Sequence, residues 1–279
     1  MAVNLAGKFE KKTSELMKAQ AKTNSIVNNN WSWTGVNEIN VYTLTDPTVG
    51  DYDDAGASNR YGTPSEVDDT TQTFTLARDR SFSKVMDMSN VQDTAGVRRP
   101  GKYVAQAVKN VMIPEIDTYR LAALNTAGAT ANRDDIVADA ATTSSNAYTN
   151  FVDINADISD NEAPEEGRVA IMTPAYFSAL KQSGTLDSSD LGYKDRKSGS
   201  VGTLDGVKLV VCPSGRFPAN VDLIITHPSV MVAPEKLKDV KIHKNAPGYN
   251  GYLIEYRHRY DAFVDTNRVN AVGIHRTAA

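Results

Sequence analysis

The feature that most constrains the fold is a long apolar stripe in the middle of the chain. Between about residues 98 and 128, large apolar side chains recur at spacings of three and four, which is typical of one face of a helix. The stripe consists of Val104, Val108, Val111, Met112, Ile116, Tyr119 and Leu124. Pro100 near its start and Gly128 near its end suit a helix that begins and ends there. At about 1.5 Å per residue this helix approaches a length of about 40 Å, so the rest of the chain must be arranged around an elongated element.

Pro114 lies inside this helix and is followed at once by two carboxylates. A proline lacks the backbone donor and presses on the carbonyl four residues earlier, which predicts a kink or a short break. Glu115 and Asp117 suggest an acid–base pair, but residues two apart lie about 200° around a helix and cannot converge on one substrate. Asp117 is spaced to pair with Arg120, and Glu115 could pair with an external cation. A structural role is therefore favoured for both carboxylates.

Two segments before the helix carry too few large apolar residues to fold alone. Residues 4–23 have helical character but a thin apolar stripe, so they predict an arm that needs a partner surface. From residue 36 the apolar period changes to two, first in VNEINVYTLT and again in TQTFTLARDRSFSKV, which indicates strands. About 25 polar residues rich in Gly, Pro, Asp and Ser separate them, and loops of that length are usually disordered or functional. We expect a hairpin that projects from the body.

These two segments carry opposite charges. Residues 1–35 hold five lysines against two glutamates, a net charge of +3, and residues 36–70 hold eight carboxylates against Arg60, a net charge of −7. The segments would be complementary if they met within one chain or between copies, and two solvated surface segments are the alternative.

After residue 128, helical and strand patterns follow each other irregularly. One helix at about 149–161 precedes a short buried strand, GRVAIMTP, and a helix that Pro174 can open. Two more strands follow in GVKLVVCP and DLIITHPSVMVAP, and long strands in YLIEYRHRYDAFVDTNRVNAVGIHR. The whole order predicts an α+β fold without the regular alternation of a doubly wound sheet.

Composition and motifs argue against several classes of function. The formal net charge of −4 disfavours a dedicated nucleic-acid binder, and no apolar run approaches the roughly 20 residues of a membrane helix. The sequence contains no phosphate-binding loop, nucleophile elbow or zinc-protease motif. The single cysteine, Cys212, has no partner for an internal disulfide, and its apolar surroundings predict a buried residue. We expect no enzyme activity, no cofactor and no membrane partner.

The acidic loop comes closest to a metal site. Asp51 and Asp53 stand at the first and third ligand positions of a calcium loop, but Ala55 and Gly62 stand where the fifth and twelfth ligands are required. No metal ligand is therefore assigned, and a calcium-dependent binding or adhesion module using residues 51–62 is kept as the alternative function.

One histidine lies in a strand pattern, EYRHRYD. Strand alternation places Tyr256, His258 and Tyr260 on one face and, on the other, Arg257, Arg259 and Asp261. We expect the aromatic face to pack on the body and the charged face to meet a partner. A hydrolase using His258 is a third hypothesis, but a catalytic histidine needs an oriented partner and the sequence proposes none.

The order of these pieces resembles the major capsid proteins of tailed bacteriophages, which have the Hong Kong 97-like fold. The resemblance covers most of the chain: the basic N-terminal arm MAVNLAGKFEKK, the strand pair VNEINVYTLT and TFTLARDRSFSKVMDM around a long loop, and the helix ending in VMIPEIDTYRLAAL. It continues through EGRVAIMTPAYFSALKQS and the closing strands YLIEYRHRYDAFV. IPEIDTYRLAAL is the most specific part.

The resemblance implies a division of the chain into five parts. These are an N-terminal arm (1–35), an extended β-hairpin loop lying over a neighbouring subunit (36–85), a spine helix with part of a peripheral domain (86–127), an axial domain (128–245), and peripheral strands (246–279).

The implied function is self-assembly into hexamers and pentamers that form an icosahedral head around packaged double-stranded DNA. The protein would belong to the virion, would be assembled in the bacterial cytoplasm, and would touch DNA only non-specifically. Some members of this family carry an N-terminal scaffolding region that is removed on maturation, whereas only about 35 residues precede the first strand here. Either a separate scaffolding protein acts or that region has been removed already, and Met1 favours the former. The resemblance also implies a portal and decoration proteins. The charged residues assigned to inter-subunit contacts are Lys8, Lys11, Lys12, Asp51, Asp53, Asp54, Arg60 and Glu115.

Overall fold

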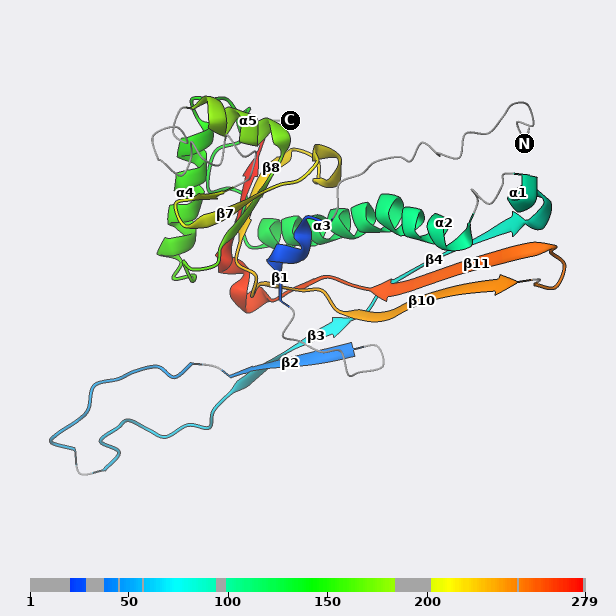
Figure 1. Ribbon diagram of the computed structural model, residues 1–279. Helices are drawn as coiled ribbons and strands as arrows, with labels where there is room; N and C mark the ends of the chain where they lie inside the picture. The colour runs from blue at the N-terminus through cyan, green and yellow to red at the C-terminus, as the bar shows by residue number, and fades with distance from the viewer. Residues whose placement is uncertain are drawn as a thin grey trace.

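The protein is known from a computed structural model, which combines helices and sheets as the sequence analysis expects. The structure describes residues 21–28, 38–44, 46–56, 58–93, 99–183, 202–244 and 246–277. A globular part is built on a five-stranded sheet, an elongated part consists of a helical rod along three long strands, and a hairpin projects away from both (Figure 1). Within the described ranges, no helix is long and apolar enough to cross a lipid bilayer.

The expected long helix is confirmed as three consecutive helical segments. These are α2 (Pro100–Ala107), a π-helical segment η2 (Val108–Met112) and α3 (Ile113–Thr130). The expected break at Pro114 takes the form of this π-helical segment, which ends two residues before the proline. The carbonyl that Pro114 crowds belongs to Asn110, inside the π-helical segment, so the wider turn relieves the contact that a regular helix would make.

Three antiparallel strands run along the rod (Figure 1). In sheet order they are β10 (Glu235–Lys244), β11 (Gly251–Tyr260) and β4 (Arg78–Asp87). The expected aromatic face of β11 is confirmed, because Tyr256, His258 and Tyr260 are all buried, and Tyr256 and Tyr260 form an apolar cluster with Met112 of the rod. The expectation for Asp261 is wrong. It is buried, since β11 ends at Tyr260 and the chain leaves the alternation there.

The projecting hairpin consists of two strands and a long loop. Strand β2 (Glu38–Leu44) pairs with β3 (Asp69–Thr75), with Glu38 opposite Thr75 and Leu44 opposite Asp69. The apolar alternation predicts that the second strand of the hairpin continues to residue 85, whereas β3 ends at Thr75 and β4 pairs with β11 of the body. Phe74 stacks on Phe263 with 4.9 Å between ring centroids, which anchors the base of the hairpin.

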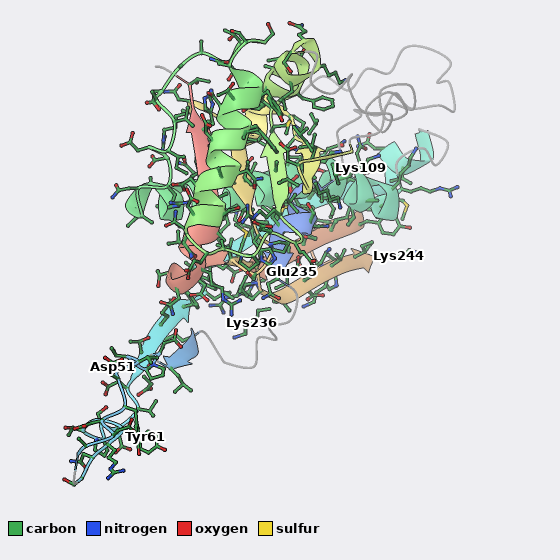
Figure 2. The ribbon with its side chains drawn as sticks, turned by 90° about the vertical axis from the view of Figure 1, so that its left-hand side faces the viewer. Asp51, Tyr61, Lys109, Glu235, Lys236 and Lys244 are labelled. Atoms are coloured by element: carbon green, nitrogen blue, oxygen red, sulfur yellow. The ribbon has the colours of Figure 1, made fainter. Side chains whose placement is uncertain are left out.

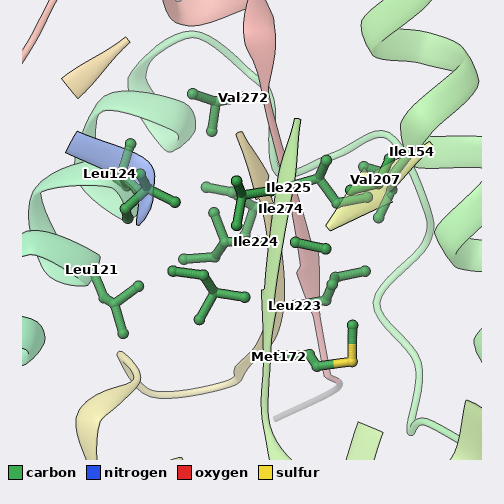
Figure 3. Packing of buried hydrophobic residues seen from close by; sticks show 14 of the residues in the cluster. Leu121, Leu124, Ile154, Met172, Val207, Leu223, Ile224, Ile225, Val272 and Ile274 are labelled. Atoms are coloured by element: carbon green, nitrogen blue, oxygen red, sulfur yellow. The ribbon is translucent and has the colours of Figure 1, made fainter. Parts of the chain in front are cut away.

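The five-stranded sheet holds the main core. Its strand order is β13 (Val272–Arg276), β8 (Val221–Thr226), β5 (Val169–Met172), β7 (Val207–Val211) and β6 (Thr203–Leu204). Figure 3 shows Leu121 and Leu124 of α3 on one side of these strands and Ile154 of α4 (Ala147–Asp160) on the other. The approach is close, because a Cβ added at Gly128 would clash with the side chain of Ile274, and one added at Gly273 would clash with that of Ile154.

Helix α5 (Pro174–Gln182) also contacts this sheet, and Thr173 caps it by accepting a hydrogen bond from the backbone N–H of Tyr176. Cys212 is buried as expected, and burial raises the pKa of its thiol to about 11.

A small three-stranded sheet ties the start of the described chain to the body. Its order is β1 (Val27–Asn28), β9 (Met231–Val232) and β12 (Phe263–Val264), with β1 parallel to β9. The remaining described elements are short connecting helices: η1 (Thr23–Ile26), α1 (Met88–Asp93), η4 (Ser214–Arg216) and η5 (Thr266–Ala271).

Candidate inter-subunit surfaces

Asp117 of α3 holds the segment that follows the N-terminal arm. Its carboxylate is fully buried and accepts a hydrogen bond from Arg216 Nη1 at 2.5 Å, which is also a buried salt bridge. The same carboxylate accepts from the backbone N–H of Lys22 at 3.1 Å and from Thr23 Oγ1 at 2.6 Å. A buried carboxylate with a paired cation and several donors is satisfied in place, so its role is architectural.

Arg120 binds the same segment from the next turn of α3. The spacing of three residues predicts that Asp117 pairs with Arg120, whereas the cation bound to the Asp117 carboxylate is Arg216. Arg120 Nη1 instead donates to Thr23 Oγ1 at 3.2 Å and to Asn24 Oδ1 at 2.9 Å. Burial lowers the pKa of the Arg120 guanidinium, and the nearby Asp117 opposes that effect.

Glu115 finds its cation within the chain. Arg80 Nε of β4 lies 2.6 Å from Glu115 Oε1, and Tyr260 Oη lies 3.5 Å from the same oxygen. The cation that pairs with Glu115 in the single chain is therefore Arg80 of β4, and not an external one. The two carboxylates after Pro114 have different partners on different elements and form no shared site. The contact of Glu115 with another subunit stays a prediction.

Apart from the half-buried Gly56, the described residues of the acidic loop between 46 and 68 are exposed, and hydrogen bonds close its tip. Asp53 Oδ1 accepts hydrogen bonds from the backbone N–H groups of Ala55 and Gly56, both at 3.0 Å. Arg60 Nε donates to the carbonyl of Gly56 at 2.7 Å, and the backbone N–H of Asp53 donates to the carbonyl of Arg60 at 3.0 Å. The tip is thus a closed turn. Figure 2 shows Asp51 and Tyr61 on this loop, far from the body.

The calcium alternative gains no support from this geometry. The Asp53 carboxylate, expected as the third ligand, is turned to its own backbone N–H groups. In the parts of the chain that the structure describes, no group of three or more His, Cys, Asp or Glu side chains is placed to hold a metal ion.

The edge strand β10 carries a positive surface that the sequence analysis does not single out. Its four lysines outnumber its two carboxylates, and between them three apolar side chains, Leu237, Val240 and Ile242, are exposed by 38 to 45%. Figure 2 shows Lys236 and Lys244 toward the two ends of this strand. The available signal was the run KLKDVKIHK, in which lysines alternate with apolar residues. The predicted arm residues Lys8, Lys11 and Lys12 lie outside the described residues.

No family model and no curated protein matches the sequence. Solved structures match it over nearly its whole length. A structure from Mycobacterium phage Che8 superposes with a TM-score of 0.78 at 18% identity, covering 98% of each chain. The capsid of Cyanophage P-SCSP1u gives 0.75 at 13% identity over 99% of this chain and 93% of that one. The asymmetric unit of the mature capsid of bacteriophage PhiM1 gives 0.72 at 15% identity over 98% and 92%.

The chain has a phage-capsid fold. At these identities the likeness concerns the fold, and at that level it confirms the resemblance to capsid proteins of tailed phages that the order of the sequence motifs suggests. It also accounts for a chain in which an elongated rod, a projecting hairpin and a globular sheet domain occur together.

Proposed function

We propose that this protein is a major capsid subunit of the Hong Kong 97-like type, which assembles into hexamers and pentamers of an icosahedral phage head around double-stranded DNA. The observation that carries the proposal is the hairpin of residues 38–75. Its long acidic loop stands away from its own body in a chain whose fold is shared with phage capsids. A segment that buries so little within its own chain gains stability when a neighbour covers it.

The five parts expected from the sequence receive roles in this proposal. Residues 1–35 form the arm, 36–85 contain the extended loop, 86–127 contain the spine, 128–245 form the axial domain, and 246–279 supply peripheral strands. In strand pairing, β4 and β10 would count with the peripheral part, because both hydrogen-bond to β11. The subunit is a structural protein in this proposal and performs no reaction.

The acidic loop would meet a positive surface of a neighbouring copy. The arm, with Lys8, Lys11 and Lys12, is one candidate, and the lysine-rich strand β10 is the other. The second is favoured because its lysines and its exposed apolar side chains lie together on one edge strand, and such an edge is usually covered in an assembly. Asp51, Asp53, Asp54 and Arg60 would make the loop's share of this contact.

Further partners follow from the same proposal. A separate scaffolding protein, a portal and decoration proteins would act during assembly in the bacterial cytoplasm, and the finished subunit would lie in the virion. Contact with packaged DNA would be non-specific. The formal net charge of −4 suits a container, since a strongly basic inner wall would hold the DNA tightly.

Negative-stain electron microscopy and light scattering of the purified full chain test the proposal. We expect shells, or rings of capsomer size, when the chain is produced with its scaffolding partner or concentrated alone. A chain that stays monomeric under every assembly condition, although it is folded by circular dichroism, would contradict the proposal.

A further inference from the structure

A cavity of about 210 Å³ lies between the helical rod and the inner face of the three-stranded sheet. Arg120 lines it from α3, Tyr256 and His258 from β11, and Glu235 and Lys238 from β10. The segment after the N-terminal arm also reaches it. A single water needs only about 10–15 Å³ of such volume, so this cavity has room for a small ligand together with water.

Three buried polar side chains on this cavity have atoms without a hydrogen-bond partner. Among the residues that the structure describes, these atoms are both ring nitrogens of His258, Oη of Tyr256 and Nε of Arg120. His258 is 1% exposed, Tyr256 2% and Arg120 7%. Nε2 of His258 lies 3.6 Å from Oε2 of Glu235, which is within ion-pair range when the ring is protonated but longer than a normal hydrogen bond. This contact lowers the pKa of the Glu235 carboxyl. Buried polar groups are nearly always paired, so three in one cavity point to an absent partner.

The side chains around the cavity indicate which charge the missing ligand carries. Arg120 and Lys238 are cations, the Tyr256 hydroxyl can donate, and either tautomer of His258 offers one N–H. Asp117 also lines the cavity, but its carboxylate is occupied by Arg216. Glu235 is the one lining carboxylate with spare acceptor capacity among the described residues, and it lies at the exposed rim. Donors thus outnumber acceptors, and an acceptor-rich ligand would satisfy them.

Across the sheet, two further charges flank His258. Lys238 on β10 and Arg80 on β4 stand directly opposite it in the strand register, so the three side chains share one face. Arg80 is paired with Glu115, whereas Lys238 lines the cavity itself. Glu235, which also lines the cavity, balances Lys238, so the excess positive charge at the cavity is that of Arg120.

We propose that this cavity binds a small oxyanion, such as sulfate, phosphate or a carboxylate, through Arg120, Lys238, Tyr256 and His258. The bound anion would join the rod to the sheet. Because Arg120 also binds Thr23 and Asn24, the anion would hold the guanidinium that anchors the segment after the arm. The proposal concerns the folded chain itself and does not rest on capsid assembly.

Calorimetric titration of the full-length chain with sodium sulfate tests the proposal, with sodium chloride at matched ionic strength as the reference. We expect saturable binding of one sulfate per chain and a change in the ring resonances of His258 by nuclear magnetic resonance. Titration with acetate distinguishes a site for small inorganic anions from one that also accepts a carboxylate.

Four variants locate the site. Tyr256→Phe and His258→Gln should each weaken sulfate binding about tenfold, because each removes a hydrogen bond to a charged ligand. Glu235→Gln should strengthen binding, because it removes the competing carboxylate. Lys244→Gln, on the same strand but outside the cavity, should leave the affinity unchanged and controls for general loss of positive charge.

Tyr256→Phe keeps the ring that stacks on Phe82 at a centroid distance of 5.1 Å, so this variant should fold even if His258→Gln does not. Sulfate also stabilises proteins by exclusion from their surface, but that effect does not saturate and is shared by all variants. Equal affinities in the wild type and Tyr256→Phe, or no saturable heat and no change at His258, would overturn the proposal and leave a cavity filled by water alone.

Discussion

The globular part buries its large apolar side chains, whereas the loop of the projecting hairpin exposes them. In α4, Phe151, Ile154 and Ile158 are fully buried against the five-stranded sheet. In the loop, Val49 and Tyr61 are exposed by 92 and 93%. The first region has its packing partners within the chain. The second has a closed turn at its tip but almost no buried apolar surface among the residues that the structure describes, so those residues give it little to pack against.

The long sheet is intermediate between these two regions. Its inner face is covered by the helical rod, while the edge strand β10 leaves Leu237, Val240 and Ile242 partly exposed. The fraction of apolar side chains that are buried therefore decreases from the main core, through the half-covered sheet, to the solvent-exposed loop. Such a decrease is expected of a subunit that completes its packing in an assembly.

The comparison between the core and the loop is tested most sharply by two side-chain truncations in the isolated subunit. Phe151→Ala should lower the free energy of unfolding by about 3–5 kcal/mol, because it leaves a cavity in the main core. Tyr61→Ala should change it by no more than about 0.5 kcal/mol. Urea denaturation measures both. A loss for Tyr61→Ala as large as that for Phe151→Ala would mean that the loop packs on its own body.

The buried salt bridge of Asp117 should behave as part of the core. Asp117→Asn leaves Arg216 buried without its counter-charge and should cost about 3 kcal/mol or more. Glu115→Gln, which affects the partly exposed pair with Arg80, is the matched control and should cost about 1 kcal/mol or less. Because Asp117 also accepts from the backbone of Lys22, trypsin should cut after Lys22 faster in Asp117→Asn. Unchanged stability and cleavage would show that the carboxylate does not anchor this segment.

Reversing the charge of the loop should separate assembly from stability. Replacing Asp51, Asp53 and Asp54 together with Lys should block particle formation, since the loop would then repel a positive surface on its neighbour, while the melting temperature of the isolated subunit stays nearly constant. The control is Asp153→Lys with Asp160→Lys, two exposed carboxylates on α4. If the loop variant lowers subunit stability while particles still form, the extended-loop assignment is incorrect.

A small effect on stability is also expected at Pro114. Pro114→Ala restores a backbone donor and removes the crowding that accompanies the π-helical segment, so the free energy of unfolding should change by about 1 kcal/mol or less. A straighter rod should instead alter the yield or diameter of shells in electron micrographs. Thr126→Ala, which removes a hydroxyl-to-carbonyl hydrogen bond to Ala122 farther along the same helix, should leave both unchanged. Shells of normal size and yield from Pro114→Ala would show that assembly does not depend on the shape of the rod.

Much of the fold could be predicted because it depends on neighbouring residues. Apolar spacings of three and four predicted the rod, the proline predicted its irregular turn, and alternation predicted the buried face with His258. The edge strand β10 was within reach of the same reasoning, through its alternating lysines, and was missed. The burial of Asp261 was predicted wrongly, because alternation ceases to apply where a strand ends, and the sequence pattern does not mark that end.

The sequence by itself determined where the chain is helical, where it is extended, and which long stretch cannot bury itself, because backbone sterics and apolar periodicity act over a few residues. Only the tertiary structure decided that Arg216 neutralises Asp117 across 99 residues of sequence, and that β4 leaves the hairpin to pair with β11. It also decided that Arg120, Tyr256 and His258 meet around one cavity. Such contacts depend on how distant segments fold back on one another, and no local pattern records that.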